Sequence, residues 1–461
     1  MFVNIHNPAN PSEVVGTFPT IAPEDVPEMI LTARAAQREW AKIPQPERGK
    51  IVDIFLNGLE ARSEDIATAI TREMGKMIGE ARGEVAKALG EGRATTRRAS
   101  APIGEILPSQ KPGTVTYSTR RPRGVIVGIN PWNFPFSTPT RKTIPALVYG
   151  NAMVLKPSIS TPGAAFIMQE VADATLPKGL FQIAYGSGKL GKALTAARSV
   201  DAISFTGSVE IGRTVAQAAA ANLTEISLEL GGKNPAILND TSDLEVTLDQ
   251  IYLAAFAVCG QRCTAISRVI VRRAIEAEVV EGLAKRAQAA RIGDGLDTNT
   301  TIGPLMGEKA RNDVAGFVDR ARAAGAKVAA GGKTIKQNGG YFYAPTILSN
   351  VTPDMEIARE EVFGPVVAVI PYDTPNQALE ICNDVEFGLS ACLYSEQTPL
   401  TDRFIAEAES GMIHVNCGSF PEDHAPFVGV KNSSLGVGGS NGTSTMHFYT
   451  QEHTVFRKGH A

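Results

Sequence analysis

Apolar residues recur at helical spacing over the opening part of the chain. Between residues 23 and 98 they stand three or four positions apart, as at Val52, Phe55, Leu56 and Leu59, while charged residues occupy the opposite face. This period is typical of amphipathic helices that bury one apolar stripe. We therefore predict a helical opening segment.

From residue 124 the pattern changes to short apolar runs that alternate with helical stretches. The runs occupy residues 124–129, 152–155, 181–185 and 202–205. Apolar strands separated by helices predict a parallel sheet that is wound with helices on both faces. Ligands bind at the carboxyl ends of the strands in such a sheet.

A second alternating series starts near residue 234 and continues to about residue 416, which predicts another α/β domain. Two β segments stand apart from both series. One covers residues 115–118, and the other combines residues 448–450 with 454–456. We expect the closing segment to be a terminal strand that needs a partner sheet.

Length and charge narrow the possible functions. The 461 residues are too many for one hydrophobic core and suggest two or three domains. Lys and Arg number 45 against 48 Asp and Glu, so no field for nucleic acid or a membrane surface is implied. The start of the chain lacks a signal-like pattern, and five cysteines without framework spacing fit a reducing compartment, so we expect a cytoplasmic protein.

The most informative segment surrounds Cys263, which stands in a small, polar turn after an apolar helical stretch. A cysteine acts as a nucleophile only as its thiolate, so it needs a stabilising field and access to substrate. We interpret Cys263 as a candidate nucleophile and expect the other four cysteines to be small buried apolar residues. Cys259 and Cys263 have metal-ligand spacing, but no second ligand pair follows, so we expect no metal.

Two glycine-containing turns are candidate anion sites. Residues 186–191 read Gly-Ser-Gly-Lys-Leu-Gly after a predicted strand, where a helix N-terminus could hold a pyrophosphate, although a plain turn explains the pattern as well. Thr206, Gly207 and Ser208 open a second helix in the same way. Together the two turns favour a nucleotide.

Two polar residues stand in settings that suit catalysis. Glu229 lies among apolar neighbours, and burial makes a carboxylate a better general base, although pairing with Lys233 or a backbone amide is an alternative. Asn133 is mounted between two prolines and two aromatic residues, which suits an oxyanion donor, although an ordinary turn is possible.

These stretches together resemble the aldehyde dehydrogenase superfamily over nearly the whole chain. The segments occur in the family's order: Pro131-Trp132-Asn133-Phe134-Pro135, Lys156-Pro157-Ser158, Phe205-Thr206-Gly207-Ser208, Leu228-Glu229-Leu230-Gly231-Gly232-Lys233, Gly260-Gln261-Arg262-Cys263, Glu360-Glu361-Val362-Phe363-Gly364-Pro365-Val366 and Ala425-Pro426-Phe427. The resemblance implies that Cys263 attacks the aldehyde carbon. It also implies that Asn133 stabilises the oxyanion with the Cys263 N–H, and that Glu229 activates the water that releases a carboxylic acid.

The resemblance further implies a nicotinamide dinucleotide cofactor. Its implied contacts are Lys156 at the adenosine ribose, Gly207 and Ser208 near the pyrophosphate, Glu361 at the nicotinamide ribose, Phe363 at the nicotinamide end, and Trp132 and Leu230 along the same cleft. Many members that prefer NAD carry a glutamate where this chain has Ile159. Without that charge, and with Ser158 or Lys189 to assist, we predict that NADP is used at least as well as NAD.

Arg141 suggests the substrate class. It follows Asn133 along the next helix, and a guanidinium in the aldehyde tunnel would bind a carboxylate remote from the aldehyde, although a surface arginine beside Lys142 is the alternative. Phe427 is expected to line the same tunnel. Succinic semialdehyde dehydrogenases have a matching arginine, but a second arginine of theirs is Ala257 here.

Several stretches are most similar to the α-ketoglutaric semialdehyde (2,5-dioxovalerate) dehydrogenase branch, namely residues 104–109, 141–142 with 145–151, and 351–355. We therefore expect that five-carbon substrate, with succinic semialdehyde or a broad specificity as alternatives. Val428 stands where many relatives have glycine, which alters the mouth of the tunnel. A catalytically silent homologue and a coenzyme A-acylating enzyme are further alternatives, both disfavoured by the retained Glu229.

The resemblance also gives the expected organisation. The fold class is α/β, with two doubly wound parallel-sheet domains and a small β element for oligomerisation. We expect residues 1–112 and 124–233 to form the dinucleotide-binding domain and residues 234–430 the catalytic domain. Residues 113–123 and 440–461 would supply the strands that pair with a neighbour in a homodimer or homotetramer.

Overall fold

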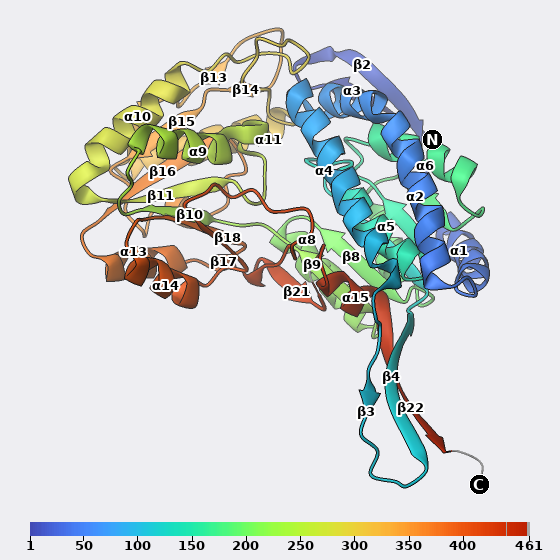
Figure 1. Cartoon of the computed structure of the whole chain (residues 1–461). Helices are drawn as coiled ribbons and strands as arrows, with labels where there is room; N and C mark the ends of the chain where they lie inside the picture. The colour runs from blue at the N-terminus through green and yellow to red at the C-terminus, as the bar shows by residue number, and fades with distance from the viewer. Residues whose placement is uncertain (439, 459–461) are drawn as a thin grey trace.

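The computed structural model of the chain describes residues 1–438 and 440–458. Figure 1 shows two α/β lobes side by side and a narrow β arm that projects from one of them. The first lobe opens with helices, as the apolar spacing predicts. They are α1 (Val26–Trp40), α2 (Gln45–Ala61), α3 (Ser63–Met74) and α4 (Ile78–Thr96).

The sheet of the first lobe has the order β21-β9-β8-β5-β6-β7. Its strands are β5 (Val125–Ile129), β6 (Ala152–Lys156), β7 (Phe181–Ile183), β8 (Ala202–Thr206), β9 (Glu225–Glu229) and β21 (Ser434–Gly436). Neighbouring strands are parallel except β21, which pairs antiparallel with β9. The helices between them are α5 (Ser137–Val148), α6 (Gly163–Thr175), α7 (Gly188–Ala196) and α8 (Val209–Ala220).

The sheet of the second lobe has the order β12-β15-β16-β11-β10-β18-β19. Its strands are β10 (Asn234–Leu238), β11 (Ile266–Arg272), β12 (Lys327–Ala330), β15 (Thr346–Ser349), β16 (Val366–Tyr372), β18 (Ser390–Tyr394) and β19 (Met412–Val415). Among the described strands of this sheet, the edge strand β12 pairs antiparallel with β15, and all other neighbours are parallel. Its helices are α9 (Leu244–Phe256), α10 (Glu276–Gln288), α11 (Glu308–Ala323), α12 (Glu356–Arg359), α13 (Pro375–Asn383) and α14 (Thr398–Glu407).

Each lobe has its own apolar core. Strand β9 ends at Glu229 and β10 begins at Asn234, so the chain passes from the first sheet to the second over residues 230–233. The predicted α/β class with two largely parallel sheets is confirmed. Among the helices of the described ranges, none combines the length and apolar character that crossing a bilayer requires.

The projecting arm is a sheet in the order β22-β4-β3, made of β3 (Ile106–Leu107), β4 (Thr114–Pro122) and β22 (Thr450–Lys458). Our prediction of strand at residues 448 and 449 is wrong. Phe448 and Tyr449 end helix α15 (Ser444–Tyr449) and are buried in the core of the first lobe. A helical turn lets both rings reach that core, and only the residues that follow extend into the arm.

Short β pairs complete the structure, and the amino-terminal one escaped the sequence analysis. They are β1 (Phe2–Asn7) with β2 (Asn10–Pro19), β13 (Thr334–Ile335) with β14 (Phe342–Tyr343), and β17 (Phe387–Gly388) with β20 (Val430–Lys431). The first hairpin connects the lobes, since the carbonyl of Pro8 accepts a hydrogen bond from the N–H of Tyr341 at 3.0 Å. The predicted strand at 181–185 is shorter than expected and ends at Ile183.

Candidate active site

The loop that carries Cys263 follows a sharp left-handed turn. After α9, the backbone φ angles are 58° at Val258, 55° at Cys259 and 69° at Gly260. Positive φ is uncommon for residues with a side chain and costs most for β-branched valine. A Cβ at Gly260 would lie 2.3 Å from the carbonyl oxygen of Gly364, so only glycine fits there. The turn aims the Cys263 side chain at the space between the lobes.

Hydrogen bonds from two elements hold this turn. Glu80, in the first turn of α4, accepts the Val258 N–H at 2.7 Å and the Met77 N–H at 3.1 Å. The side-chain amide of Gln261 donates to the carbonyl oxygens of Val258 at 3.1 Å and Pro304 at 3.3 Å. Because buried hydrogen bonds of this kind offset backbone strain, the turn is fixed from both lobes.

The Cys263 thiol packs against an apolar cluster of Leu389, Met412 and Phe427. Burial raises the pKa of Cys263 to about 12, and the nearby carboxylates of Glu361 and Glu229 add to the rise. The guanidinium groups of Arg262 and Arg141 oppose it. The positive field that we expected around the thiol is thus present but outweighed by burial and by the carboxylates.

The other cysteines follow expectation with one exception. Cys259, Cys382 and Cys392 are buried, but Cys417 is exposed, so its predicted burial is wrong. It follows the end of β19 in a loop, beyond the sheet that buries Cys392. Within the described ranges, no group of three or more His, Cys, Asp or Glu side chains is arranged to hold a metal ion.

Asn133 lies across the cleft from the nucleophile loop and is bound to it. Its side-chain amide donates to the carbonyl oxygen of Gln261 at 2.9 Å. The backbone carbonyl oxygen of Asn133 accepts a hydrogen bond from the ammonium of Lys76 at 2.8 Å. Lys76 also forms a buried ion pair with Glu84 at 2.6 Å. Among residues 1–438 and 440–458, the bond to Gln261 is the one hydrogen bond that Nδ2 of Asn133 donates, so the second amide hydrogen can act as a donor in the cavity.

Glu84 also fixes the start of α5. One of its carboxylate oxygens accepts the backbone N–H groups of Phe136 and Ser137, each at 2.9 Å. These are donors at a helix start, which lack partners within the helix. Lys76 and Glu84 therefore hold the segment that carries Asn133 from both ends. Sequence analysis missed this pair, because nothing in the spacing of Lys76, just before α4, and Glu84, within it, distinguishes these buried charges from surface ones.

Glu229 stands at the carboxyl end of β9 and is buried. Its carboxylate accepts the backbone N–H of Ser440 at 3.0 Å and the hydroxyl of Thr206 at 3.3 Å. Of the two partners considered for this carboxylate, a backbone amide is present, whereas Lys233 is not among its bonded partners in the described chain; its role as a general base stays a prediction. Behind Thr206, the ammonium of Lys142 donates to its hydroxyl at 2.8 Å, and burial lowers the pKa of Lys142 to about 8.

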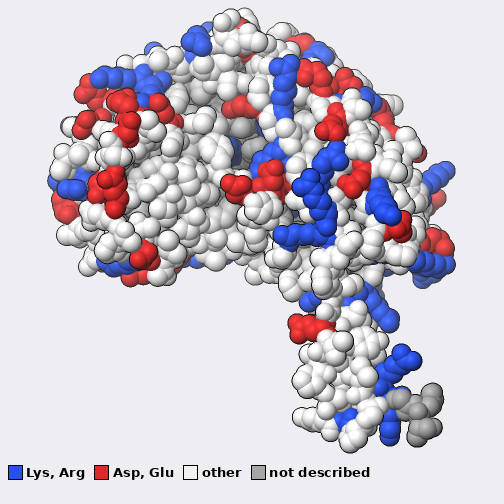
Figure 2. Space-filling model, viewed as in Figure 1, with Lys and Arg blue, Asp and Glu red and all other residues white. Residues whose placement is uncertain are grey.

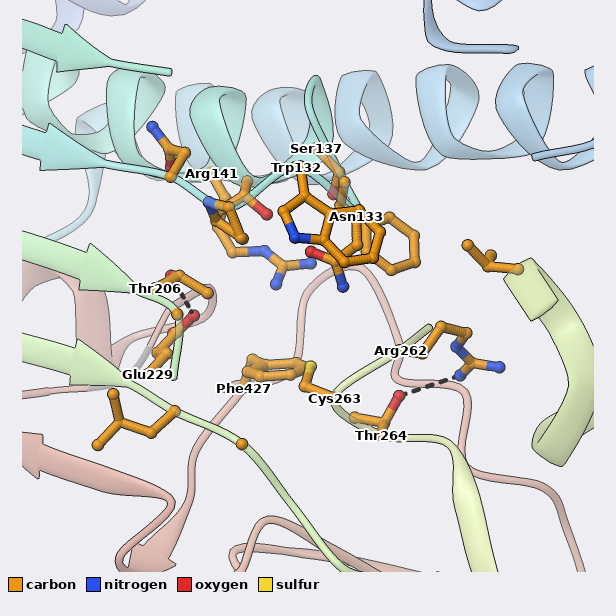
Figure 3. Close-up of a pocket in the computed structure, with 18 of the residues that line it drawn as sticks. Trp132, Asn133, Ser137, Arg141, Thr206, Glu229, Arg262, Cys263, Thr264 and Phe427 are labelled. Atoms are coloured by element: carbon orange, nitrogen blue, oxygen red, sulfur yellow. Dashed lines mark hydrogen bonds between the residues drawn. The ribbon is translucent and has the colours of Figure 1, made fainter. Parts of the chain in front are cut away.

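These side chains surround one cavity of ≈ 730 Å³ between the lobes. Figure 3 shows Trp132, Asn133 and Arg141 entering from one wall, Glu229 and Thr206 from a second, and Cys263 with Phe427 from the opposite side. Figure 2 shows charges of both signs interspersed over the visible face of the two lobes. Of the residues proposed from sequence, the cavity lining includes Trp132, Asn133, Arg141, Gly207, Ser208, Glu229, Leu230, Cys263, Glu361, Phe363 and Phe427.

One half of the cavity is formed by aromatic rings and by small residues at the start of α8. The rings of Trp132 and Phe363 meet edge to face with centroids 5.5 Å apart. Ser208 caps α8, and its hydroxyl accepts the Ile211 N–H at 3.4 Å. A helix N-terminus beside a glycine is a suitable cradle for a phosphate, because its free N–H groups point outward. This half can hold a dinucleotide.

Glu361 closes the same half of the cavity. Its carboxylate accepts the N–H of Gly232 at 3.1 Å, and a Cβ at Gly231 would lie 2.1 Å from its other oxygen. Burial raises the pKa of Glu361 to about 7, opposed by the Gly232 hydrogen bond and by Lys233. Glu361 thus contacts the backbone just after β9 and lies within electrostatic reach of the thiol.

Lys156, Ser158 and Ile159 lie at or after the end of the neighbouring strand β6. Burial lowers the pKa of Lys156 to about 8, and its aliphatic chain passes 3.4 Å from the Cβ position of Gly191. The Ser158 hydroxyl accepts the N–H of Ser160, while Ile159 packs on the core of the first lobe. The Gly-Ser-Gly-Lys-Leu-Gly segment spans the turn from β7 to α7, and its Lys189 is exposed.

Arg141 lies on α5 with its side chain in the cavity wall, and the alternative of a surface arginine is wrong. Its guanidinium is ion-paired to Glu91 of α4 at 2.7 Å and lies over the Phe427 ring, 4.9 Å from the centroid. Burial alone would lower the pKa of Arg141, but Glu91 more than compensates and raises it. Sequence analysis missed Glu91, because only the packing of α4 on α5 brings the two residues together.

Comparison with known proteins agrees with this geometry. Residues 2–455 match the model of the aldehyde dehydrogenase family. The chain is 37% identical to an alpha-ketoglutaric semialdehyde dehydrogenase of Bacillus subtilis, over 99% of this chain and 94% of that protein. It is 34% identical to a betaine aldehyde dehydrogenase of Mesorhizobium japonicum, over 96% of this chain and 91% of that protein.

The fold has solved counterparts. A betaine aldehyde dehydrogenase of Staphylococcus aureus, crystallised in complex with NAD+, superposes with a TM-score of 0.96 and 31% identity. The superposition covers 99% of this chain and 92% of that one.

Proposed function

The chain belongs to the aldehyde dehydrogenase family of oxidoreductases, and on this premise we propose that its substrate is an acidic semialdehyde, α-ketoglutaric semialdehyde in particular. The observation that carries this proposal is Arg141, a guanidinium held in the cavity wall by Glu91. A guanidinium binds a carboxylate through two parallel hydrogen bonds. The similarity to the Bacillus subtilis enzyme supports the five-carbon keto acid.

The proposed reaction starts at Cys263. Its thiolate attacks the aldehyde carbon, a C–S bond forms, and the carbonyl π electrons move to oxygen to give a thiohemiacetal oxyanion. The free amide hydrogen of Asn133 and the Cys263 N–H stabilise that oxyanion. Collapse of the oxyanion expels hydride and leaves a thioester on sulfur.

The half of the cavity with Trp132, Phe363 and the start of α8 fits a nicotinamide dinucleotide, since it offers a flat slot beside a helix N-terminus. The bound cofactor supplies the acceptor for the hydride. Gly207 and Ser208 would hold its pyrophosphate, Leu230 would line its slot, Glu361 would bind the nicotinamide ribose and Lys156 the adenosine ribose. Use of NAD or NADP follows from the family, and we propose NADP as at least an equal cofactor because Ile159 carries no repelling charge.

Glu229 completes the cycle as general base for water. It takes a proton from water, the oxygen attacks the thioester carbon, and the C–S bond breaks to release the carboxylic acid and regenerate the thiolate. Thr206 and the Ser440 N–H hold the carboxylate at this place. Retention of such a base favours hydrolysis over transfer of the acyl group to coenzyme A.

A betaine aldehyde carries a fixed cation, and Arg141 would repel it, so we favour an acid over the substrate of the Mesorhizobium relative. Succinic semialdehyde is the second candidate because it also has a distal carboxylate. We further propose a homodimer or homotetramer in which the arm of β4 and β22 pairs with a neighbour, since both strands are nine residues long and most of β22, at the edge of the arm, is exposed. A cytoplasmic location stays a prediction from cysteine usage.

A panel of acidic, neutral and cationic aldehydes of matched length, assayed with each nicotinamide cofactor, tests the proposal. We expect the highest kcat/KM for an acidic semialdehyde. Arg141→Ala should raise its KM about tenfold or more and leave neutral aldehydes almost unchanged. An unchanged KM for the acid would refute the role of Arg141.

A further inference from the structure

We propose that Glu91 is a positioning residue that orients Arg141 and thereby sets the preference for acidic over neutral aldehydes. This inference rests on the proposed function, because it explains how the same guanidinium reads a substrate carboxylate. Glu91 belongs to α4, lines no part of the cavity, and has a side chain that is 1% exposed. It acts only through Arg141.

The two contacts between these residues use one edge of the guanidinium. Nε of Arg141 donates to one carboxylate oxygen of Glu91 at 3.1 Å, and Nη2 donates to the other at 2.7 Å. A guanidinium has five N–H donors in one plane. Of the three that remain, one on Nη1 and one on Nη2 lie on the edge that these two nitrogens share, and the third, on Nη1, points back beside Cδ. No other hydrogen bond of this side chain occurs within residues 1–438 and 440–458. That shared edge is available for a substrate carboxylate.

A second contact restricts the guanidinium. Its Cζ lies over the Phe427 ring, 4.9 Å from the ring centroid. One edge is thus held by Glu91 while the group packs over Phe427, so it keeps little rotational freedom. A fork that is already oriented loses less entropy when a carboxylate binds. In Figure 3 the Arg141 side chain extends from α5 toward the middle of the cavity.

The charges around Glu91 explain why it does not cancel Arg141. Lys87, one turn earlier on α4, approaches the same carboxylate at 3.5 Å. Its ammonium also donates to the carbonyl oxygen of Pro421 and to the carboxylate of Asp423, each at 2.8 Å. Glu91 is shared by two cations, while Asp423 is half exposed and more strongly screened. Within this cluster the buried Glu91 therefore does not cancel both Arg141 and Lys87.

The experiment is a double-mutant cycle on Glu91→Gln and Arg141→Ala, with kcat and KM measured for an acidic semialdehyde and a neutral aldehyde of equal length. Glutamine keeps the volume of Glu91 but replaces one acceptor by a donor, so it cannot hold both N–H groups. We expect Glu91→Gln to lower the acid-to-neutral ratio of kcat/KM about tenfold, mostly through the KM of the acid. In the Arg141→Ala background the same change should leave the ratio almost unaltered.

Controls separate positioning from folding. Glu60→Gln removes a surface ion pair between Glu60 of α2 and Arg93 of α4. It should leave the acid-to-neutral ratio of kcat/KM unchanged. Glu91→Asp keeps the charge but shortens the reach, so a positioning role predicts an intermediate ratio and a purely electrostatic one predicts the parent value. Thermal unfolding and the neutral-aldehyde kcat report whether each variant is folded.

The two proposals fail in different ways. If the parent enzyme does not prefer the acid, the proposed substrate class is wrong, and the positioning role of Glu91 is rejected with it. If the parent prefers the acid but Glu91→Gln keeps the ratio, or lowers it equally without Arg141, only the inference about Glu91 is overturned. If Glu91→Gln lowers the acid-to-neutral ratio in the parent but not in the Arg141→Ala background, the result supports both the substrate class and the positioning role of Glu91.

Discussion

The carboxylate of Glu80 accepts the backbone N–H of Val258 at 2.7 Å, five residues before the nucleophile. Val258 has a left-handed backbone, and its N–H has no partner within a helix. A side chain at the start of α4 in the first lobe thus fixes the turn that presents Cys263 from the second. This hydrogen bond connects the two lobes close to the Cys263 thiol.

Replacing Glu80 should therefore change kcat more than the KM of the aldehyde. We expect Glu80→Leu to lower kcat at least tenfold with little change in KM, because a small displacement of the thiol disturbs the attack geometry. Glu80→Gln keeps an oxygen acceptor for the Val258 N–H and should stay within about threefold of the parent. Steady-state kinetics of both variants checks this, and equal losses in both would contradict it.

The buried pair of Lys76 and Glu84 should contribute to stability and to catalysis separately. Lys76→Met leaves Glu84 buried without its partner, which costs about 3–5 kcal/mol and lowers the melting temperature. Adding Glu84→Leu removes the second charge and should recover much of that stability. It should not recover kcat, because the backbone carbonyl of Asn133 loses its hydrogen bond from Lys76 in both variants. Calorimetry with kinetics on the single and double variants decides the matter, and recovered kcat would exclude the positioning role.

The thiol should respond to Glu361. Burial and the carboxylates of Glu361 and Glu229 raise the pKa of Cys263 to about 12, so the thiolate fraction at neutral pH is small without cofactor. Alkylation by iodoacetamide should become faster with rising pH and show no plateau below about pH 10. Glu361→Gln removes one negative neighbour and should speed the reaction several-fold at pH 8.

Mass spectrometry of the modified peptides gives this rate, because the exposed Cys417 will react as well. Cys263→Ser identifies the signal of the nucleophile. An alkylation rate that is independent of both pH and Glu361 would mean that the thiol is already ionised.

The cofactor preference should depend on Ile159. We expect kcat/KM for NADP to equal or exceed that for NAD, and a hundredfold preference for NAD would refute this. Ile159→Glu introduces a carboxylate after β6, which can accept from a ribose hydroxyl and repels a phosphate. It should shift the ratio toward NAD about tenfold or more. Lys189→Ala, at an exposed position in the first turn of α7, tests whether that cation assists NADP.

Local sequence predicted the strands and most of the cavity because each signal lies within a few residues. The run at 202–205 marks strand β8, and Gly207 and Ser208 mark the start of α8. Local sequence could not predict which residues bind to those of the site. Glu91, Glu84 and Thr206 acquire their roles only when α4, α5 and β9 pack together, and that packing has no local signature.

The same reason explains the errors. Phe448 and Tyr449 have strong strand propensity, but burial against the first lobe makes them helical. The expected field around Cys263 was judged from neighbours in sequence, whereas burial and Glu361 determine its pKa. Propensity and spacing describe a segment, while these properties belong to contacts between segments.

Strand β21 returns from the end of the chain to the edge of the first sheet, where Ser434 is in register with Glu229 and Ser440 supplies an N–H to that carboxylate. Both of these contacts come from residues that follow the second lobe in the sequence, about two hundred positions after Glu229. The first sheet therefore cannot complete the surroundings of Glu229 from its own consecutive segment. A carboxyl-terminal tag or deletion that disturbs this return would act directly on hydrolysis, although it lies far from Cys263 in sequence.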